Sequence, residues 1–173
     1  MAAQRVFRDL LALAAEPLPG CEVLLRRDEQ GEISLDVWYV LLHMHLEAED
    51  QPLRVPFELR FPHDYPQRQP ELQCMCQNLS HPCVVPTRSG RLVCLTMFDV
   101  PQNVHGGTNG SAGFVPYSGW TAAFSGHAVL MQLQGFFDED VWTNDLSAKQ
   151  LATLRAEVQA YSDRVLAGAL PVE

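Results

Sequence analysis

The spacing of apolar residues changes from a helical period to a strand period and back, and this order restricts the fold. Apolar side chains from Ala2 to Glu16 lie on one stripe, which predicts an amphipathic helix. Cys21–Arg27 and Glu32–His45 follow, the second with apolar residues at alternate positions, and the turn at 28–31 predicts a β-hairpin. A helical pattern returns between Trp120 and Phe137. Helices that flank a run of strands predict an α+β domain.

Two further strands and a last helix complete this predicted domain. Val55–Phe61 and Glu71–Cys76 have strand character, and the prolines between them exclude a continuous central strand. A C-terminal helix covers about residues 147–168 and opens with a Ser-Ala-Lys-Gln capping box. We therefore predict a single domain over residues 1–173, with an N-terminal helix, a four-stranded antiparallel meander, and central and C-terminal helices.

The charge and the cysteine count restrict the partners and the compartment. The 12 Lys and Arg residues against 21 Asp and Glu residues give a formal net charge of -9, so we expect neither nucleic acid nor a membrane surface as a partner. The apolar stretch Val6–Ala15 is too short to span a bilayer and lacks the layout of a signal peptide. Five cysteines, an odd number, favour free thiols in a reducing compartment, and we expect the cytoplasm or the nucleus.

A glycine-rich segment lies before the central helix. Residues 99–119 hold five of the 11 glycines in the chain. A loop of this length inside a compact domain is either functional or mobile. We interpret it as a loop insertion, and a flexible loop in solvent is its simplest form.

Several short motifs follow one another in order between residues 61 and 120. They are Phe61-Pro62-His63-Asp64-Tyr65-Pro66, then Pro70, His81-Pro82, Gly90-Arg91-Leu92-Val93-Cys94-Leu95 and Trp120. In this order they resemble the core of ubiquitin-conjugating enzymes, which reads F-P-x-x-Y-P, P, H-P-N, G-x-I-C-L and W-x-P-A. The similarity covers roughly residues 4–137, and it implies the α+β fold of that family.

The resemblance assigns the central chemistry to Cys94. This residue aligns with the cysteine that accepts the C-terminus of ubiquitin or a ubiquitin-like modifier from an activating enzyme and passes it to a lysine or a ligase. A thiolate is a good nucleophile and a good leaving group, so one atom can accept and release an acyl chain. The alternative is that Cys94 is a small buried apolar residue between Val93 and Leu95.

The resemblance also implies supporting roles around the nucleophile. His81, Pro82, Cys83 and Trp120 would surround the active site. Asp138, which follows the central helix, would gate the site and orient the attacking lysine. No cofactor is implied, because the activating enzyme spends the nucleotide.

Contacts with partner proteins are implied at four positions. Arg5 and Arg8 match the basic character of the first helix, which meets the activating enzyme in relatives. Gln67 and Ala122 stand where relatives have an aromatic residue and a proline that contact ligases. The expected partners are therefore the modifier, an activating enzyme and a ligase.

The chain departs from the family pattern beside the nucleophile. Cys83 replaces the asparagine that usually follows His-Pro and supports the oxyanion, and a thiol is a poor hydrogen-bond donor. The segments from His81 to Cys94 and from Cys94 to Trp120 are both longer than in short members of the family. These departures leave open a second interpretation, a catalytically weak or inactive binding or scaffold protein. The second insertion could also be a lid that recruits an acceptor or a ligase.

A second cluster, Cys74-x-Cys76-x4-His81-x-Cys83, has the ligand types of a structural zinc site. Its spacing argues against zinc, because the C-x2-C knuckle is absent and Cys74 and Cys76 would share one face of a strand. The family resemblance places these two cysteines on inward-facing core positions. We therefore expect no metal, and a zinc-stabilised interaction domain is the third interpretation.

Overall fold

The computed structural model describes residues 2–28, 30–44, 52–88, 90–98, 119–137 and 146–172. Its elements in chain order are α1 (Ala2–Ala15), β1 (Cys21–Leu25), β2 (Val37–Met44), β3 (Leu53–Arg60), β4 (Glu71–Cys74), β5 (Val84–Thr87), β6 (Gly90–Val93), α2 (Gly126–Phe137), α3 (Ala148–Tyr161), the π-helix η1 (Ser162–Leu166) and β7 (Leu170–Pro171). Asp138 and most of the glycine-rich insertion lie outside the described residues. Among the helices described, none is long and apolar enough to cross a membrane.

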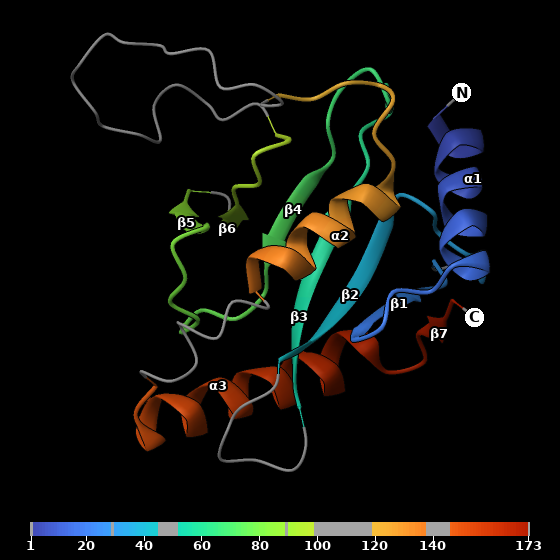
Figure 1. Ribbon diagram of the computed structural model, residues 1–173. Helices are drawn as coiled ribbons and strands as arrows, with labels where there is room; N and C mark the ends of the chain where they lie inside the picture. Colours follow the sequence, from blue (N-terminus) through green and yellow to red (C-terminus); the bar gives the residue numbers. More distant parts are fainter. Residues whose placement is uncertain are drawn as a thin grey trace, which may run out of the picture.

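The strands form one antiparallel sheet in the order β5-β6-β4-β3-β2-β1-β7 (Figure 1). The four predicted strands are β1 to β4, which pair in chain order as a meander. Within the described residues the sheet has seven strands rather than four, because β5, β6 and β7 are added. β5, β6 and β7 have only four, four and two residues and no clear alternation of apolar residues, and they depend on the strands with which they pair.

The second predicted strand begins later than its apolar pattern indicated. β2 starts at Val37, and Glu32–Asp36 makes only an isolated bridge, at Ile33. The side chain of Asp28 accepts two backbone hydrogen bonds and closes the turn before this segment. Ile33 is exposed, so this part of the alternating pattern has no buried face to extend the ladder.

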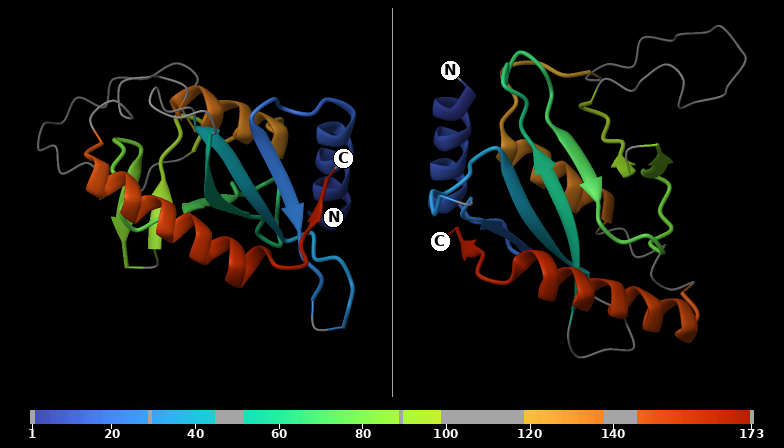
Figure 2. Two further views of the ribbon diagram at one scale, coloured as in Figure 1. Left: turned by 90° about the horizontal axis from the view of Figure 1, so that it is seen from below. Right: turned by 180° about the vertical axis from the view of Figure 1, so that it is seen from behind.

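The sheet lies between α2 and α3. On β3, Phe57 faces α2 and its ring centroid is 5.4 Å from that of Phe137. The next residue, Glu58, points to the other face, where the Tyr161 hydroxyl of α3 donates to its Oε1 at 2.7 Å. Figure 2 shows α2 and α3 on opposite sides of the strands. Both faces of the central strands are therefore covered over part of their length.

The central helix α2 begins later than predicted, at Gly126. The carbonyls of Ala122 and Phe124 accept hydrogen bonds from Arg5, and the Gly126 N–H, which would donate to Ala122 in a longer helix, donates to Asp9 instead. Ser125 then caps the helix, since its Oγ accepts a hydrogen bond from a backbone N–H in the first turn at 3.2 Å. The segment from residue 120 to residue 125 is therefore a loop.

The C-terminal helix begins where it was predicted to begin, and it ends in a short π-helix. The capping box at Ser147 is present, with both of its reciprocal hydrogen bonds. Leu154 and Tyr161 are buried on the predicted apolar face, and η1 continues the helix to Leu166. Gly168, with a φ of 77°, then turns the chain into β7, which pairs with β1.

Candidate active site

Cys94 follows β6, at the open end of a hairpin that the sequence did not reveal. β5 and β6 pair as far as Val84 and Val93, the residues next to the two cysteines. One more hydrogen bond extends the ladder, because the Cys94 N–H donates to the Cys83 carbonyl at 2.8 Å. The extra length between His81 and Cys94 therefore forms a hairpin that places Cys83 beside the candidate nucleophile.

The segment that contains His81 is held by α2 and β6. The His81 ring stacks on Phe137 of α2, with centroids 4.0 Å apart and an interplanar angle of 20°. Its Nδ1 accepts the Cys83 N–H at 3.1 Å. The guanidinium of Arg91 in β6 donates to the Leu79 carbonyl. These contacts fix the backbone that in turn accepts the Cys94 N–H.

A third support comes from α3. The Asn78 backbone N–H and side-chain amide donate to the Glu157 carboxylate at 3.0 and 2.5 Å. Sequence reasoning missed Glu157 and Arg91, because no local pattern connects them to the segment around Asn78. Pro82 is exposed, in the turn that precedes β5.

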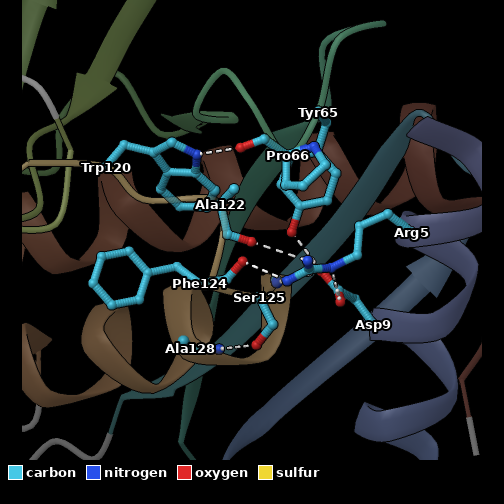
Figure 3. Close-up of polar contacts among 10 residues, drawn as sticks. Arg5, Asp9, Tyr65, Pro66, Trp120, Ala122, Phe124, Ser125 and Ala128 are labelled. Atoms are coloured by element: carbon cyan, nitrogen blue, oxygen red, sulfur yellow. Dashed lines mark hydrogen bonds and ion pairs between the residues drawn. The ribbon is translucent and has the colours of Figure 1, made fainter. Parts of the chain in front are cut away.

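A pocket of about 750 Å³ lies beside Cys94. Its walls come from the proline-containing segment after β3, from β6 and from Trp120. Trp120 is fixed in this wall, since its indole N–H donates to the Pro66 carbonyl at 2.7 Å (Figure 3). The lining contains apolar residues such as Leu92 and polar residues such as Arg68.

Asp9 joins α1 to two segments that frame this pocket (Figure 3). Its side chain is buried and accepts hydrogen bonds from Arg5 Nε at 2.8 Å, from the Gly126 N–H at 2.9 Å and from the Tyr65 hydroxyl. Burial first, and then the hydrogen bond to Asp9, raise the pKa of Tyr65. The phenol therefore stays protonated and continues to donate to the carboxylate.

The four residues predicted to contact partner proteins differ in accessibility. Arg8, Gln67 and Ala122 are exposed. Arg5 is turned inward instead, and its guanidinium donates to the carbonyls of Ala122 and Phe124 at 3.0 and 2.7 Å. Of the two arginines on α1, Arg8 is the one that a partner can reach.

The two cysteines of the proposed zinc cluster that precede His81 are core residues. Cys74 and Cys76 are buried, and the Cys74 thiol donates to the Cys76 carbonyl at 3.6 Å. Burial raises the pKa of both thiols, that of Cys74 to about 11. Within the part of the chain that the structure describes, no three His, Cys, Asp or Glu side chains are grouped to hold a metal ion. Protonated buried thiols of this kind act as small apolar side chains.

A comparison with models of protein families identifies the family to which this fold belongs. The model of the ubiquitin-conjugating enzyme family matches residues 5–167. The chain belongs to the ubiquitin-conjugating enzyme family. The solved structure of human ubiquitin-conjugating enzyme E2 G1 is similar with a TM-score of 0.53 and 20% identity, over 78% of this chain and 92% of that one, which shows a shared fold. The comparison with curated proteins returned no match.

In this member of the ubiquitin-conjugating enzyme family the Cys94 thiol is half-buried. Burial raises the pKa of Cys94 above its usual value, because the thiolate loses part of its hydration. At neutral pH the side chain is therefore held as the thiol. Its reaction as a nucleophile requires loss of this proton.

We expect the alkylation rate of Cys94 by iodoacetamide to keep rising above pH 9. Only the thiolate reacts, and its fraction grows until the pH passes the raised pKa. Timed labelling followed by mass spectrometry of the Cys94 peptide measures this rate. A short peptide with the same local sequence is the control, and its rate should level off at lower pH. A plateau below pH 8 in the folded protein would contradict a desolvated thiol.

Proposed function

We propose that the protein carries ubiquitin or a ubiquitin-like modifier as a thioester on Cys94 and transfers it to a lysine or a ligase. The position of Cys94 supports this proposal. Cys94 is half-buried, directly follows β6 and lines the pocket. Its backbone N–H donates to the Cys83 carbonyl. The family assignment and the order of the motifs agree with this role.

The proposed reaction consists of two acyl transfers. First, the Cys94 thiolate attacks the thioester that joins the modifier to the activating enzyme, a new C–S bond forms, and the thiolate of the activating enzyme leaves. Then a lysine amine attacks the Cys94 thioester, a C–N bond forms, and the Cys94 thiolate leaves. The amine loses one proton to the solvent, and the departing Cys94 thiolate takes up one proton, since burial raises the pKa of this thiol. Neither step needs a cofactor.

The proposed partners follow from the accessible residues. Arg8 on α1 is proposed to contact the activating enzyme, and Gln67 and Ala122 are proposed to contact a ligase. Asp138 stays a prediction as the residue that orients the lysine. The free thiols fit a reducing compartment, so we propose the cytoplasm or the nucleus.

Charging with a modifier tests the proposal. The protein is mixed with activating enzyme, ATP and a modifier, and we expect a band on a non-reducing gel that a thiol reductant removes. Cys94→Ala should lose this band completely, because the atom that accepts the acyl group is gone. Cys94→Ser should give an ester that resists the reductant. Cys21→Ala, at another half-buried cysteine, is the matched control and should charge as the parent protein does.

Two outcomes would contradict the proposal. The first is the absence of an adduct with every member of a panel of ubiquitin and ubiquitin-like proteins, which would support the binding or scaffold interpretation. The second is a reductant-sensitive adduct that persists in Cys94→Ala. The panel also identifies the modifier, because charging requires a matched activating enzyme for each one.

A further inference from the structure

Cys83 and Cys94 face each other across the open end of the β5–β6 hairpin. The register pairs Val84 with Val93, so the next pair outward is Cys83 with Cys94. The hydrogen bond from the Cys94 N–H to the Cys83 carbonyl, at 2.8 Å, shows that the register continues to this pair. The two thiols are therefore carried by directly opposed residues.

The burial pattern places both thiols on the same face of the hairpin. Opposed residues of an antiparallel ladder share a face, and successive residues alternate between faces. Val84 and Val93 are buried, whereas Cys83 and Cys94 are half-buried, as expected for the opposite face. Neither cysteine is in a disulfide in this structure.

The separation of such a pair is close to that of a disulfide. Opposed residues that share a ladder hydrogen bond have Cα atoms about 5.5 Å apart, inside the range of about 4.4–6.8 Å for disulfides. In a hydrogen-bonded pair the Cβ atoms lie near the upper end of a range of about 4.5–5.5 Å, and a disulfide needs about 3.5–4.5 Å, so closure requires the two residues to approach by about 1 Å. The Cys83 N–H donates to the His81 ring at 3.1 Å and not across the hairpin, so of the two hydrogen bonds possible for such a pair the Cys94 N–H makes the one to the Cys83 carbonyl.

We infer that Cys83 and Cys94 form a reversible disulfide site, which a low-molecular-weight disulfide such as oxidised glutathione closes and a thiol reductant opens. The Cys94 thiolate first attacks one sulfur of the oxidant, which forms a mixed disulfide and releases one glutathione thiolate. The Cys83 thiolate then attacks the Cys94 sulfur and releases the second glutathione. Two cysteine thiols are oxidised, one glutathione disulfide is reduced, and the two protons pass to the released thiolates.

The remaining cysteines do not compete for this site. Cys74 and Cys76 are buried in the core, so a disulfide in solution does not reach their sulfur atoms, whereas Cys83 and Cys94 are half-buried. Cys21 lies on β1, and β2, β3 and β4 separate it from β6 in the sheet. Oxidation is therefore expected to join Cys83 to Cys94. The disulfide would then occupy the sulfur atom that is proposed to carry the modifier. That inhibition rests on the proposed function, whereas formation of the disulfide does not.

Thiol counting after equilibration with glutathione tests the site. The protein is held in buffers of increasing ratio of oxidised to reduced glutathione, quenched with acid and alkylated under denaturing conditions. We expect two of the five thiols to resist alkylation until a strong reductant is added. A tryptic digest should join residues 69–88 to residues 92–149.

Matched variants identify the two thiols. The Cys83→Ser and Cys83→Ala proteins should form a mixed disulfide between glutathione and Cys94. They should not show the two thiols that resist alkylation in the parent protein. Cys21→Ser should retain the pair, and circular dichroism checks that each variant is folded. The inference is overturned if all five thiols of the parent protein are alkylated at every ratio, or if the protected pair persists in Cys83→Ser.

Charging of the same samples separates this inference from the proposed function. Charging of the parent protein should fall in proportion to the disulfide fraction and return with reductant. The Cys83→Ser protein should need a higher ratio of oxidised to reduced glutathione to lose the same fraction of its own reduced charging. In the parent protein the neighbouring Cys83 thiol completes the disulfide within one molecule, and in the variant it is absent. If the pair forms but no reduced sample charges with any modifier, the proposed function fails and the disulfide site stands.

Discussion

Asp9→Ala is expected to lower the free energy of unfolding by about 3–5 kcal/mol, the usual cost of removing one member of a buried ion pair. Asp9 is only 4% exposed, and three donors converge on its carboxylate. Its removal leaves the Arg5 guanidinium, the Tyr65 hydroxyl and the Gly126 N–H without their acceptor where little water enters. Because these donors come from α1, from the segment before β4 and from the start of α2, one substitution loosens three parts of the domain.

Urea unfolding followed by tryptophan fluorescence measures this effect. Tyr65→Phe removes one of the three donors and should cost about 1–2 kcal/mol. Arg8→Ala is the matched control on the same helix, because Arg8 is exposed and should change the stability by no more than about 0.5 kcal/mol. An Asp9→Ala protein that unfolds at the same urea concentration as Arg8→Ala would contradict the role of Asp9.

Gly126→Ala is expected to destabilise the protein by about 1–3 kcal/mol, although the same change favours most helices. A Cβ atom at this position would lie 2.7 and 2.8 Å from Cζ3 and Cη2 of Trp38 and 3.3 Å from Cζ of Phe61. The Trp38 side chain is fully buried, and its centroid is 4.8 Å from that of Phe61. The indole therefore cannot turn away without displacing its neighbours.

Gly135→Ala on the same helix is the matched control. A Cβ atom there meets nothing within 4 Å, so alanine should stabilise the helix by about 0.5–1 kcal/mol. Combining Gly126→Ala with Trp38→Phe should recover part of the loss, because phenylalanine lacks the outer ring that the methyl group meets. Equal unfolding midpoints for Gly126→Ala and Gly135→Ala would exclude the steric explanation.

Local patterns were sufficient to predict the elements that bury one face. The stripe formed by Val6, Leu10 and Leu13 packs inward on α1, as its helical spacing predicts. The capping box at Ser147 was also predictable, because its hydrogen bonds join residues within one turn. The order of the motifs pointed to the segment around Cys94 as the candidate active site. The family comparison confirmed the predicted fold.

Contacts between distant residues were not predictable in this way. Arg5 has the pattern of a solvated helix cation, yet it donates to a carbonyl 117 residues later, in the loop before α2. Glu157 and Asn78 are 79 residues apart, and neither belongs to a motif. The opposition of Cys83 and Cys94 depends on the register of the β5–β6 hairpin, whose strands are too short to show alternation.

A ribosome synthesises α3 after every residue that the helix supports. Tyr161 supplies the hydroxyl for the buried carboxylate of Glu58, and Glu157 holds Asn78 ahead of the active-site turn. A nascent chain that has folded its central strands has the Arg60 partner of Glu58, but it still lacks the Tyr161 donor and the support for the segment beside Cys94. The thiol is therefore expected to reach its final surroundings only after α3 has been synthesised and has packed on the sheet.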